Sequence, residues 1–216
     1  HLLLLALVAA SCEAAEPTRP TPHPVVVSNL RKLHGAFESY RRDHDRAYPP
    51  LVSQVDGQGR VFWPELLKSY LGDTSPKGRV DAAGPFFAPY IPVDERRGGK
   101  VTSVSFGYSR FSLGADAGRD RGMRRIVRHV PFPQRTILLA ECEAPKQPGT
   151  GWYSVYPNAG MDFSRYRGRA HVLFCDGTVR LMTPEDLNVG EGAATNTPPW
   201  FGDISLAKNQ PEAVPQ

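Results

Sequence analysis

Hydrophobic residues recur at helical spacing near the start of the folded sequence. The repeat advances in steps of four, three, four and three residues, which places its members on one stripe of an α-helix. The stripe consists of Val26, Leu30, Leu33, Phe37 and Tyr40. Charged residues take the opposite face, and Pro49-Pro50 ends the helical pattern by Tyr48. The pattern therefore predicts a long amphipathic helix that begins near Pro24.

A second, shorter helix and two strands follow from the same kind of pattern. Residues 62–72 combine apolar positions with Pro64 near the start and Gly72 at the end, which are typical helix boundaries. Apolar and small polar residues alternate within 101–113, as they do in a half-buried strand. The continuous apolar run at 137–140 suits a central strand of a sheet.

An Asp-Gly pair separates two β-type runs late in the chain. Asp176-Gly177 lies between residues 171–174 and 178–182, and Asp-Gly supplies the positive φ angles of a two-residue type I′ turn. We therefore expect a β-hairpin here. Together, the patterns predict an α+β fold in which a long N-terminal amphipathic helix packs on an antiparallel sheet of about four strands, with long irregular loops.

The first twelve residues have the pattern of an export signal. An apolar run at 2–10 ends in small residues before Cys12, and the run is too short to span a bilayer. The sequence opens on His1, so we expect further residues upstream. Small residues before a cysteine resemble a bacterial lipobox, which makes Cys12 the expected lipidation site. An ordinary cleaved signal and a structural apolar segment are the alternatives.

The rest of the sequence predicts a domain on a tether. Residues 13–24 contain four prolines and few apolar residues, a composition that favours an extended linker. Residues 25–184 carry the α+β patterns, and residues 185–216 are expected to form an irregular C-terminal tail. We therefore expect a bacterial protein of the cell envelope, periplasmic or surface-exposed, that is anchored to a membrane by its lipid or its N-terminal segment.

Composition and charge narrow the function classes. The 21 prolines and 20 glycines among 216 residues imply many turns and irregular connections. A net charge of +4 favours anionic surfaces weakly and is too small to predict specific nucleic-acid binding. The sequence has no Gly-x-Ser-x-Gly elbow, phosphate-binding loop or Cys-x-x-Cys pair. The leading expectation is therefore a protein that is not an enzyme.

Two cysteines remain if Cys12 is lipidated. Cys142 and Cys175 both stand at ends of predicted strands. In an oxidising compartment, an even pair of this kind permits one disulfide bond. Two buried, unpaired thiols are the alternative.

Arginines cluster in two stretches that are candidates for binding an anionic ligand. Guanidinium groups bind phosphates and carboxylates through paired hydrogen bonds. If both stretches face one side, they form a patch for a polyanion, and solvated loops are the alternative. The candidate residues are Arg119, Arg121, Arg124, Arg125, Arg128, Arg165, Arg167 and Arg169.

Acidic residues and one histidine give two further hypotheses. Asp162 and Asp176 are candidates for a calcium site, although Asp176 already has a structural function in the turn; no other metal or cofactor is predicted. Hydrolysis by acid–base catalysis would use His171 with Glu141, Glu143 and Asp176 at strand ends. Polar residues that merely end strands are the alternative.

Several segments, in order along the chain, resemble a family of bacterial pseudopilin-like proteins. Residues 28–33, Ser-Asn-Leu-Arg-Lys-Leu, are similar to that family's Ser-Asn-Leu-Lys-Gln-Leu helix, and residues 43–50 to its Asp-Asn-Asp-x-x-x-Pro end. Residues 172–179 are similar to its Asn-Val-Leu-Phe-Ala-Asp-Gly-His-Val hairpin. Further similar segments lie at 63–67, 105–109 and 133–141. The family carries a prepilin-type processing-associated domain named for a His-x9-Asp-Gly motif.

Two departures from the family accompany this resemblance. Tyr166 stands where the naming histidine is expected, and the short Leu-rich run with Cys12 replaces the family's long, methylated apolar helix. The resemblance implies a pilin-like fold and a non-enzymatic function in cell-envelope assembly, type II secretion-like export or surface interaction, with other envelope or secretion proteins as partners. The alternatives are a stand-alone envelope lipoprotein that binds an anionic ligand through Arg-rich loops, and a hydrolase with its site at the strand ends.

Overall fold

The computed structural model describes most of the chain between Thr21 and Val189. The described ranges are 21–55, 59–92, 94–110, 113, 127–144, 150–156, 160–189, 196–197 and 200–201. They form a mixed α and β structure with few helices and a central sheet of five strands. The prediction of mixed α and β content is therefore confirmed.

The central sheet has the strand order β5-β3-β4-β6-β7. Its strands are β3 (Phe106–Ser109), β4 (Ile137–Glu141), β5 (Ser154–Val155), β6 (Ala170–Phe174) and β7 (Val179–Met182). Neighbouring strands are antiparallel except β3 and β5, which run parallel. The sheet differs from the expected one by a fifth strand and by this parallel pairing. The additional strand β5 has two residues, too few to leave a periodic pattern in the sequence.

Two small hairpins and a second helix complete the elements. Strand β1 (Val52–Val55) pairs with β2 (Gly59–Phe62), and β8 (Asn196–Thr197) pairs with β9 (Trp200–Phe201). Helix α2 (Trp63–Leu67) continues into the 3₁₀ helix η1 (Lys68–Leu71), which Gly72 caps, and this agrees with the helix predicted at 62–72. Further 3₁₀ segments are η2 (Asp94–Gly99) and η3 (Pro133–Arg135).

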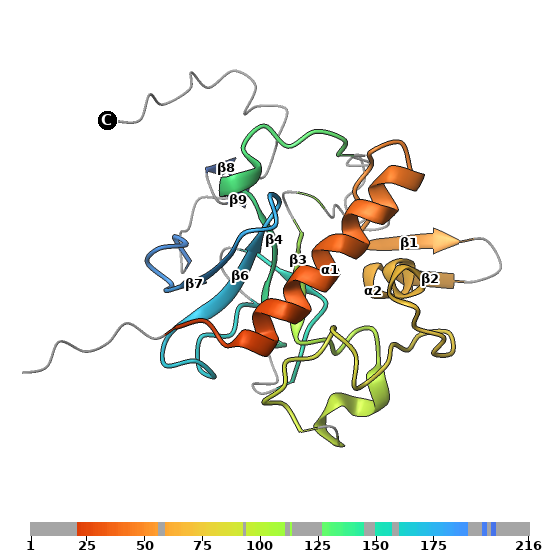
Figure 1. Ribbon diagram of the computed structural model, residues 1–216, viewed down its shortest axis with the longest axis horizontal. Helices are drawn as coiled ribbons and strands as arrows, with labels where there is room; N and C mark the ends of the chain where they lie inside the picture. The colour runs from red at the N-terminus through yellow and green to blue at the C-terminus, as the bar shows by residue number, and fades with distance from the viewer. Residues whose placement is uncertain are drawn as a thin grey trace, which may run out of the picture.

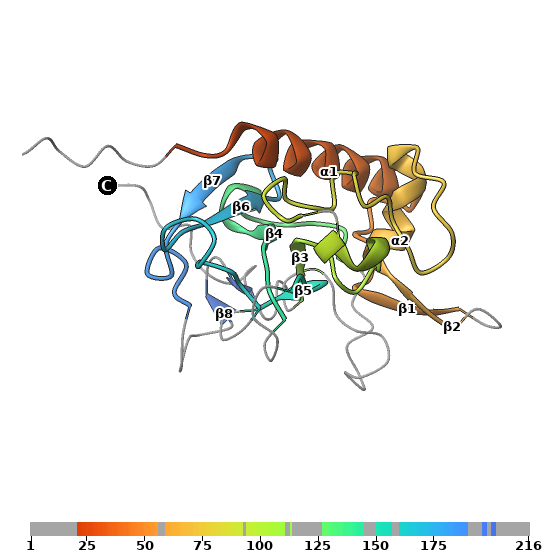
Figure 2. The same ribbon diagram turned by 90° about the horizontal axis from the view of Figure 1, so that it is seen from below.

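Helix α1 (Pro24–Asp43) lies across one face of the central sheet (Figures 1 and 2). Its buried residues are Val26, Leu30, Leu33, Ala36, Phe37 and Tyr40, the stripe read from the sequence together with Ala36. The ring centroid of Phe37 lies 5.6 Å from that of Trp63 and 5.1 Å from that of Tyr108. Because these rings come from α1, α2 and β3, the three elements share one core.

Helix α1 ends at Asp43, before the limit at Tyr48 that the sequence suggested. Asp45 and Arg46 take left-handed φ angles of 58° and 62°, and an α-helix cannot continue through such residues. The Arg46 N–H donates a 2.7 Å hydrogen bond to the carbonyl oxygen of Arg41. The N–H of His44 donates to the same oxygen at 3.4 Å, so these two bonds satisfy a carbonyl group at the end of the helix.

Apolar side chains fill both faces of the central sheet. On the face away from α1 they form a second cluster of Ile137, Ala140, Cys142, Val155, Met161, Ala170, Val172, Phe174 and Leu187. All residues of β4 and β6 are buried, which explains why 137–140 is an uninterrupted apolar run. Leu187 is fully buried, so the folded unit continues past the predicted boundary at residue 184.

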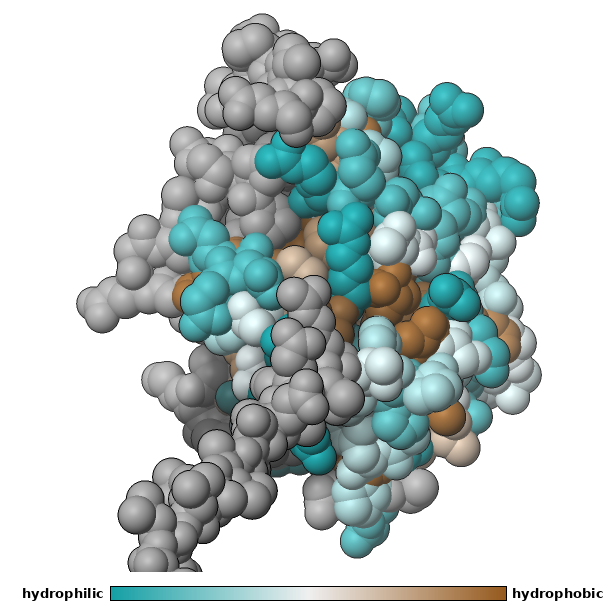
Figure 3. All heavy atoms as spheres, turned by 60° about the vertical axis from the view of Figure 1, so that its left-hand side comes forward, coloured by the Kyte–Doolittle hydropathy of each residue, from teal (hydrophilic) through white to brown (hydrophobic). Residues whose placement is uncertain are grey.

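Large apolar side chains are rarely exposed on the described surface. In Figure 3, brown apolar residues form small, separate areas among teal and white ones. Val25, in the first turn of α1, is the one large apolar side chain classed as exposed within the described ranges, at 47%. Among the same residues, no helix combines the length and the apolar character that crossing a membrane requires.

Candidate functional site

The N-terminal end of α1 is held to the sheet by a buried histidine. The backbone N–H of His23, directly before α1, donates a 2.8 Å hydrogen bond to Nε2 of His171 on β6. The Nδ1 atom of His171 lies 2.8 Å from Oε2 of Glu141, at the end of β4. His171 is 0% exposed and Glu141 is 3% exposed. We call His23, His171 and Glu141, with Tyr166 introduced below, the N-terminal clamp.

The hydrogen bonds fix the proton positions in the clamp. A backbone N–H can only donate, so Nε2 of His171 must offer its lone pair, and the ring proton sits on Nδ1. That proton is donated to Glu141, whose Oε2 also accepts the backbone N–H of His171 at 2.7 Å. The other oxygen, Oε1, is buried without a hydrogen-bond partner in the described part of the chain. His171 is therefore a neutral connector between the helix end and a buried carboxylate.

Tyr166 extends the clamp upstream along the chain. Its ring meets the ring of His171 edge to face, with centroids 4.8 Å apart. Its hydroxyl donates a 2.6 Å hydrogen bond to the carbonyl oxygen of Thr21. The residue at the position of the resembled family's naming histidine thus holds the segment that leads into α1.

The Asp176-Gly177 motif lies at the other end of β6 and has a structural function. The N–H of Gly177 donates to the carbonyl of Phe174, and the N–H of Phe174 to the carbonyl of Thr178. Gly177 has a φ of 85°, whereas Asp176 is absent from the described residues with positive φ. The predicted two-residue type I′ turn is therefore wrong. The hairpin has a three-residue loop with the glycine in the left-handed position, the other common solution for a short hairpin.

The hairpin loop also contacts α1. His34 of α1 lies with Nε2 3.2 Å from the carbonyl oxygen of Cys175. A Cβ atom on Gly177 would lie 3.0 Å from Cε1 of His34, so a larger residue would have to displace this ring, and the positive φ also favours glycine. The Asp176 carboxylate accepts the N–H and the hydroxyl of Thr178, at 2.9 and 2.8 Å.

No disulfide joins Cys142 and Cys175, and both cysteines are free and buried. Strands β4 and β6 are antiparallel, so the C-terminal ends of the two strands, where the cysteines lie, are at opposite ends of the pair. The N–H of Cys175 donates to Thr136, before β4, whereas Cys142 follows β4. Burial raises the pKa of Cys175 to about 12 and that of Cys142 above its ordinary value. The alternative of two buried, unpaired thiols fits the structure.

The described residues of the two arginine stretches lie near opposite ends of α1. Arg128 lies at the C-terminal end of α1, where its Nε donates to the carbonyl of Asp45 at 3.2 Å. The second stretch surrounds Tyr166, near the N-terminal end. A helix of 20 residues separates these ends by roughly 30 Å at about 1.5 Å per residue. The other four members of the first stretch, Arg119, Arg121, Arg124 and Arg125, lie outside the described residues, so a shared face of the two stretches stays a hypothesis.

Within the second stretch, the arginines differ in their surroundings. Arg165 forms an ion pair with Asp162, with Nε and Oδ2 2.8 Å apart. Arg167 is exposed and has a left-handed φ of 53°, while Arg169 lies close enough to Asp186 to interact electrostatically. Arg165 therefore has a structural partner and is not free to hold a ligand.

The structure separates the calcium and hydrolase candidates. The N–H of Asp162 donates to the carbonyl of Glu141 at the end of β4, and that of Asp176 to Pro133 before the strand begins. The two carboxylates thus lie at opposite ends of β4 and do not share a cation site. In the described ranges, no three His, Cys, Asp or Glu side chains form a group that could hold a metal.

Of the four hydrolase candidates, the structure brings together two. His171 and Glu141 are adjacent, while Asp176 lies at the opposite end of β6. Glu143 follows β4, and its N–H donates to the carbonyl of Gly160. Both nitrogens of His171 already have hydrogen-bond partners, so this pair serves the clamp.

His23 was missed by the sequence analysis, which placed it in the tether. It acts through its backbone N–H, which nearly every residue type offers, so no sequence signal could have identified it. Comparison with family models, curated proteins and solved structures found no match.

Proposed function

We propose that this chain is a pseudopilin-like domain of the bacterial cell envelope, tethered to a membrane through its N-terminal segment. It would act without catalysis in assembly, secretion or surface interaction. The observation that carries the proposal is the N-terminal clamp. Tyr166 binds the chain at Thr21 and His171 binds it at His23, in the last part of the predicted tether and directly upstream of α1. Such an attachment suits a domain that is anchored through its N-terminal segment and receives mechanical force through it.

The fold adds support for a pilin-like arrangement. Helix α1 lies along the sheet, and the hairpin β6-β7 follows near the end of the folded region, as the resemblance implies. The side chain of Asn29, within the family-like helix segment, donates a 3.0 Å hydrogen bond to the carbonyl of Phe87. The family-like residues thus connect the helix to the loop beside it, which is consistent with a framework function.

The environment of His171 favours a non-enzymatic function. A catalytic base needs a nitrogen that can reach a substrate proton. His171 is fully buried, and its nitrogens face the His23 N–H and the Glu141 carboxylate. A substrate would have to displace the start of α1 to reach it.

Membrane attachment is tested with the 216-residue chain behind an initiating methionine in bacterial cells. We expect the protein in the washed membrane fraction, labelled by an alkyne fatty acid. The variant Cys12→Ser should lose the label and leave the membrane fraction. If the variant stays in the membrane and remains labelled, the proposed lipid tether is wrong.

Assembly is tested by oxidative cross-linking through Val25, the exposed apolar residue at the start of α1. In membranes, Val25→Cys should give disulfide-linked dimers if copies pack near the tether. The matched control is Arg42→Cys, an exposed position in the last turn of the same helix. A membrane-bound Val25→Cys protein that forms no more dimer than the control would favour the stand-alone lipoprotein instead.

A further inference from the structure

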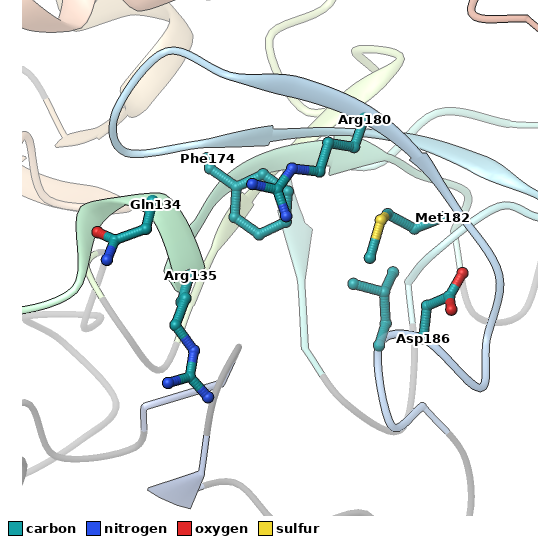
Figure 4. A pocket seen from close by; sticks show the side chains of 7 residues that line it. Gln134, Arg135, Phe174, Arg180, Met182 and Asp186 are labelled. Atoms are coloured by element: carbon teal, nitrogen blue, oxygen red, sulfur yellow. The ribbon is translucent and has the colours of Figure 1, made fainter. Parts of the chain in front are cut away.

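A small pocket opens on the sheet face turned away from α1. Its volume is about 180 Å³, and residues from three segments line it (Figure 4). The hairpin β6-β7 contributes Phe174, Arg180 and Met182, η3 contributes Gln134 and Arg135, and the turn after β7 contributes Asp186 and Leu187. None of these seven residues belongs to the N-terminal clamp or to the arginine stretches considered above.

The inner surface of the pocket is apolar and well fixed. Phe174 is 3% exposed and Leu187 is 0% exposed, so both are parts of the second core. The guanidinium group of Arg180 lies over the Phe174 ring, 5.0 Å from its centroid. Stacking of this kind holds the guanidinium plane in place while leaving its N–H groups able to donate.

The arginines of this pocket lack the carboxylate partners that others have. Arg41 is paired with Glu38, and Arg165 with Asp162, at 2.6 and 2.8 Å. In the described part of the chain, neither Arg135 nor Arg180 forms an ion pair with an acidic side chain. Two exposed cations therefore stand beside an apolar surface without a counter-charge of their own.

The one carboxylate in the pocket is already engaged. Oδ2 of Asp186 accepts the backbone N–H of Thr183 at 2.9 Å, and this hydrogen bond lowers the pKa of Asp186. Arg169 lies near it and compensates part of its charge. The remaining charge of the pocket is positive, and it lies on Arg135 and Arg180.

We propose that this pocket binds a carboxylate that carries one apolar group. The carboxylate would pair with the guanidinium groups, and the apolar group would contact Phe174, Met182 and Leu187. A volume of about 180 Å³ is below that of pockets for drug-sized ligands, so it suits a single ring or branched chain. The source is a free aromatic or branched acid or the C-terminal residue of a peptide. This proposal does not depend on the proposed membrane tether.

The test uses the 216-residue chain in detergent and small probes followed by NMR. The probes are N-acetyl-phenylalanine, its C-terminal amide and 3-phenylpropionate. We expect both carboxylates to shift the Met182 methyl signal with a dissociation constant on the order of 1 mM, and the amide to bind at least about tenfold more weakly. Tighter binding of the acetylated amino acid identifies a peptide C-terminus, and equal or tighter binding of phenylpropionate identifies a free acid.

Variants show whether the effect is local. Arg180→Gln and Arg135→Gln should each weaken carboxylate binding at least about tenfold, with unchanged melting temperatures because both side chains are exposed. Arg167→Gln is the control, since it removes the same charge outside the pocket. The proposal is overturned if the amide binds as well as the acid, or if Arg167→Gln weakens binding as much as Arg180→Gln does. It is also overturned if the carboxylate probes, at a concentration 20-fold above the expected dissociation constant, do not shift the Met182 methyl signal.

Discussion

Replacing His171 by leucine should destabilise the protein far more than an average histidine substitution. Leucine fills much of the same space but can neither accept the His23 N–H nor donate to Glu141. A neutral hydrogen bond contributes about 1 kcal/mol and one to a charged group about 2 kcal/mol, so the two together amount to about 3 kcal/mol. The Glu141 carboxylate would also stay buried with the residue-171 backbone N–H as its one remaining donor.

This loss is measured by urea and thermal unfolding at neutral pH. For a chain of this length, about 3 kcal/mol corresponds to a fall in melting temperature of roughly 6–12 °C. Amide hydrogen exchange gives a local readout, because the His23 N–H should exchange faster in the variant. His34→Leu is the matched control: it removes one neutral hydrogen bond, to the Cys175 carbonyl, and should cost about 1 kcal/mol.

A second substitution tests the electrostatic part of the reasoning. Adding Glu141→Gln to His171→Leu should recover about 1 kcal/mol, because the glutamine oxygen still accepts the backbone N–H while the unpaired charge disappears. The reasoning is refuted if His171→Leu costs less than about 1 kcal/mol. It is also refuted if the double variant is less stable than His171→Leu alone.

Three further predictions follow from particular contacts. In urea unfolding, Gly177→Ala should lower the free energy of unfolding by about 2 kcal/mol and Gly168→Ala by about 1 kcal/mol. Both glycines have a positive φ, but only at Gly177 would the added methyl group also meet His34. Equal losses in the two variants would contradict that contact. With Cys12 replaced by serine, Ellman's reagent should find no reactive thiol in the native protein and two per chain in denaturant. The reason is that both cysteines are buried, which raises the pKa of Cys175 to about 12 and that of Cys142 above its ordinary value. Rapid reaction of the native protein would contradict the burial of these thiols. For Asp73, burial disfavours ionisation, but hydrogen bonds from Ser75 and from the N–H of residue 81 lower its pKa below the ordinary 3.8. Its stabilisation is therefore present above pH 3.8 and lost as pH falls through the lowered pKa, so the stability difference from Asp73→Asn should shrink between pH 5 and pH 2; a difference that is independent of pH would exclude this linkage.

Elements with a strong local pattern were the ones that the sequence could predict. The stripe from Val26 to Tyr40 repeats with the helical period, and the 137–140 run is too apolar for anything but a buried element. The β6-β7 hairpin was expected from its flanking runs, but its turn type was not. Asp-Gly fits a two-residue turn, and it equally fits a three-residue loop in which the residue before Asp176 joins the turn.

Features that depend on pairing between distant segments were harder to predict from the sequence. Placing Cys142 and Cys175 at strand ends was correct, but their separation follows from the antiparallel direction of β4 and β6, which single-strand patterns do not contain. The pocket arginines were missed for a similar reason. Arg135 and Arg180 are isolated in the sequence, and only the pairing of β6 with β7 next to η3 brings them to one hollow.

Tyr166, at the position of the resembled family's naming histidine, has a structural function in this chain. Tyr166 contributes a ring edge to His171 and a hydroxyl to the Thr21 carbonyl, so it connects the segment before α1 to the middle of the sheet. Strands β4 and β6, which carry Glu141 and His171, are central strands with neighbours on both sides. A pull on the N-terminal segment would therefore be transmitted to the best-supported strands, whereas an attachment to α1 alone would load only the packing of one helix. If the domain is tethered as proposed, the buried pair of His171 and Glu141 would spread such a force over two central strands.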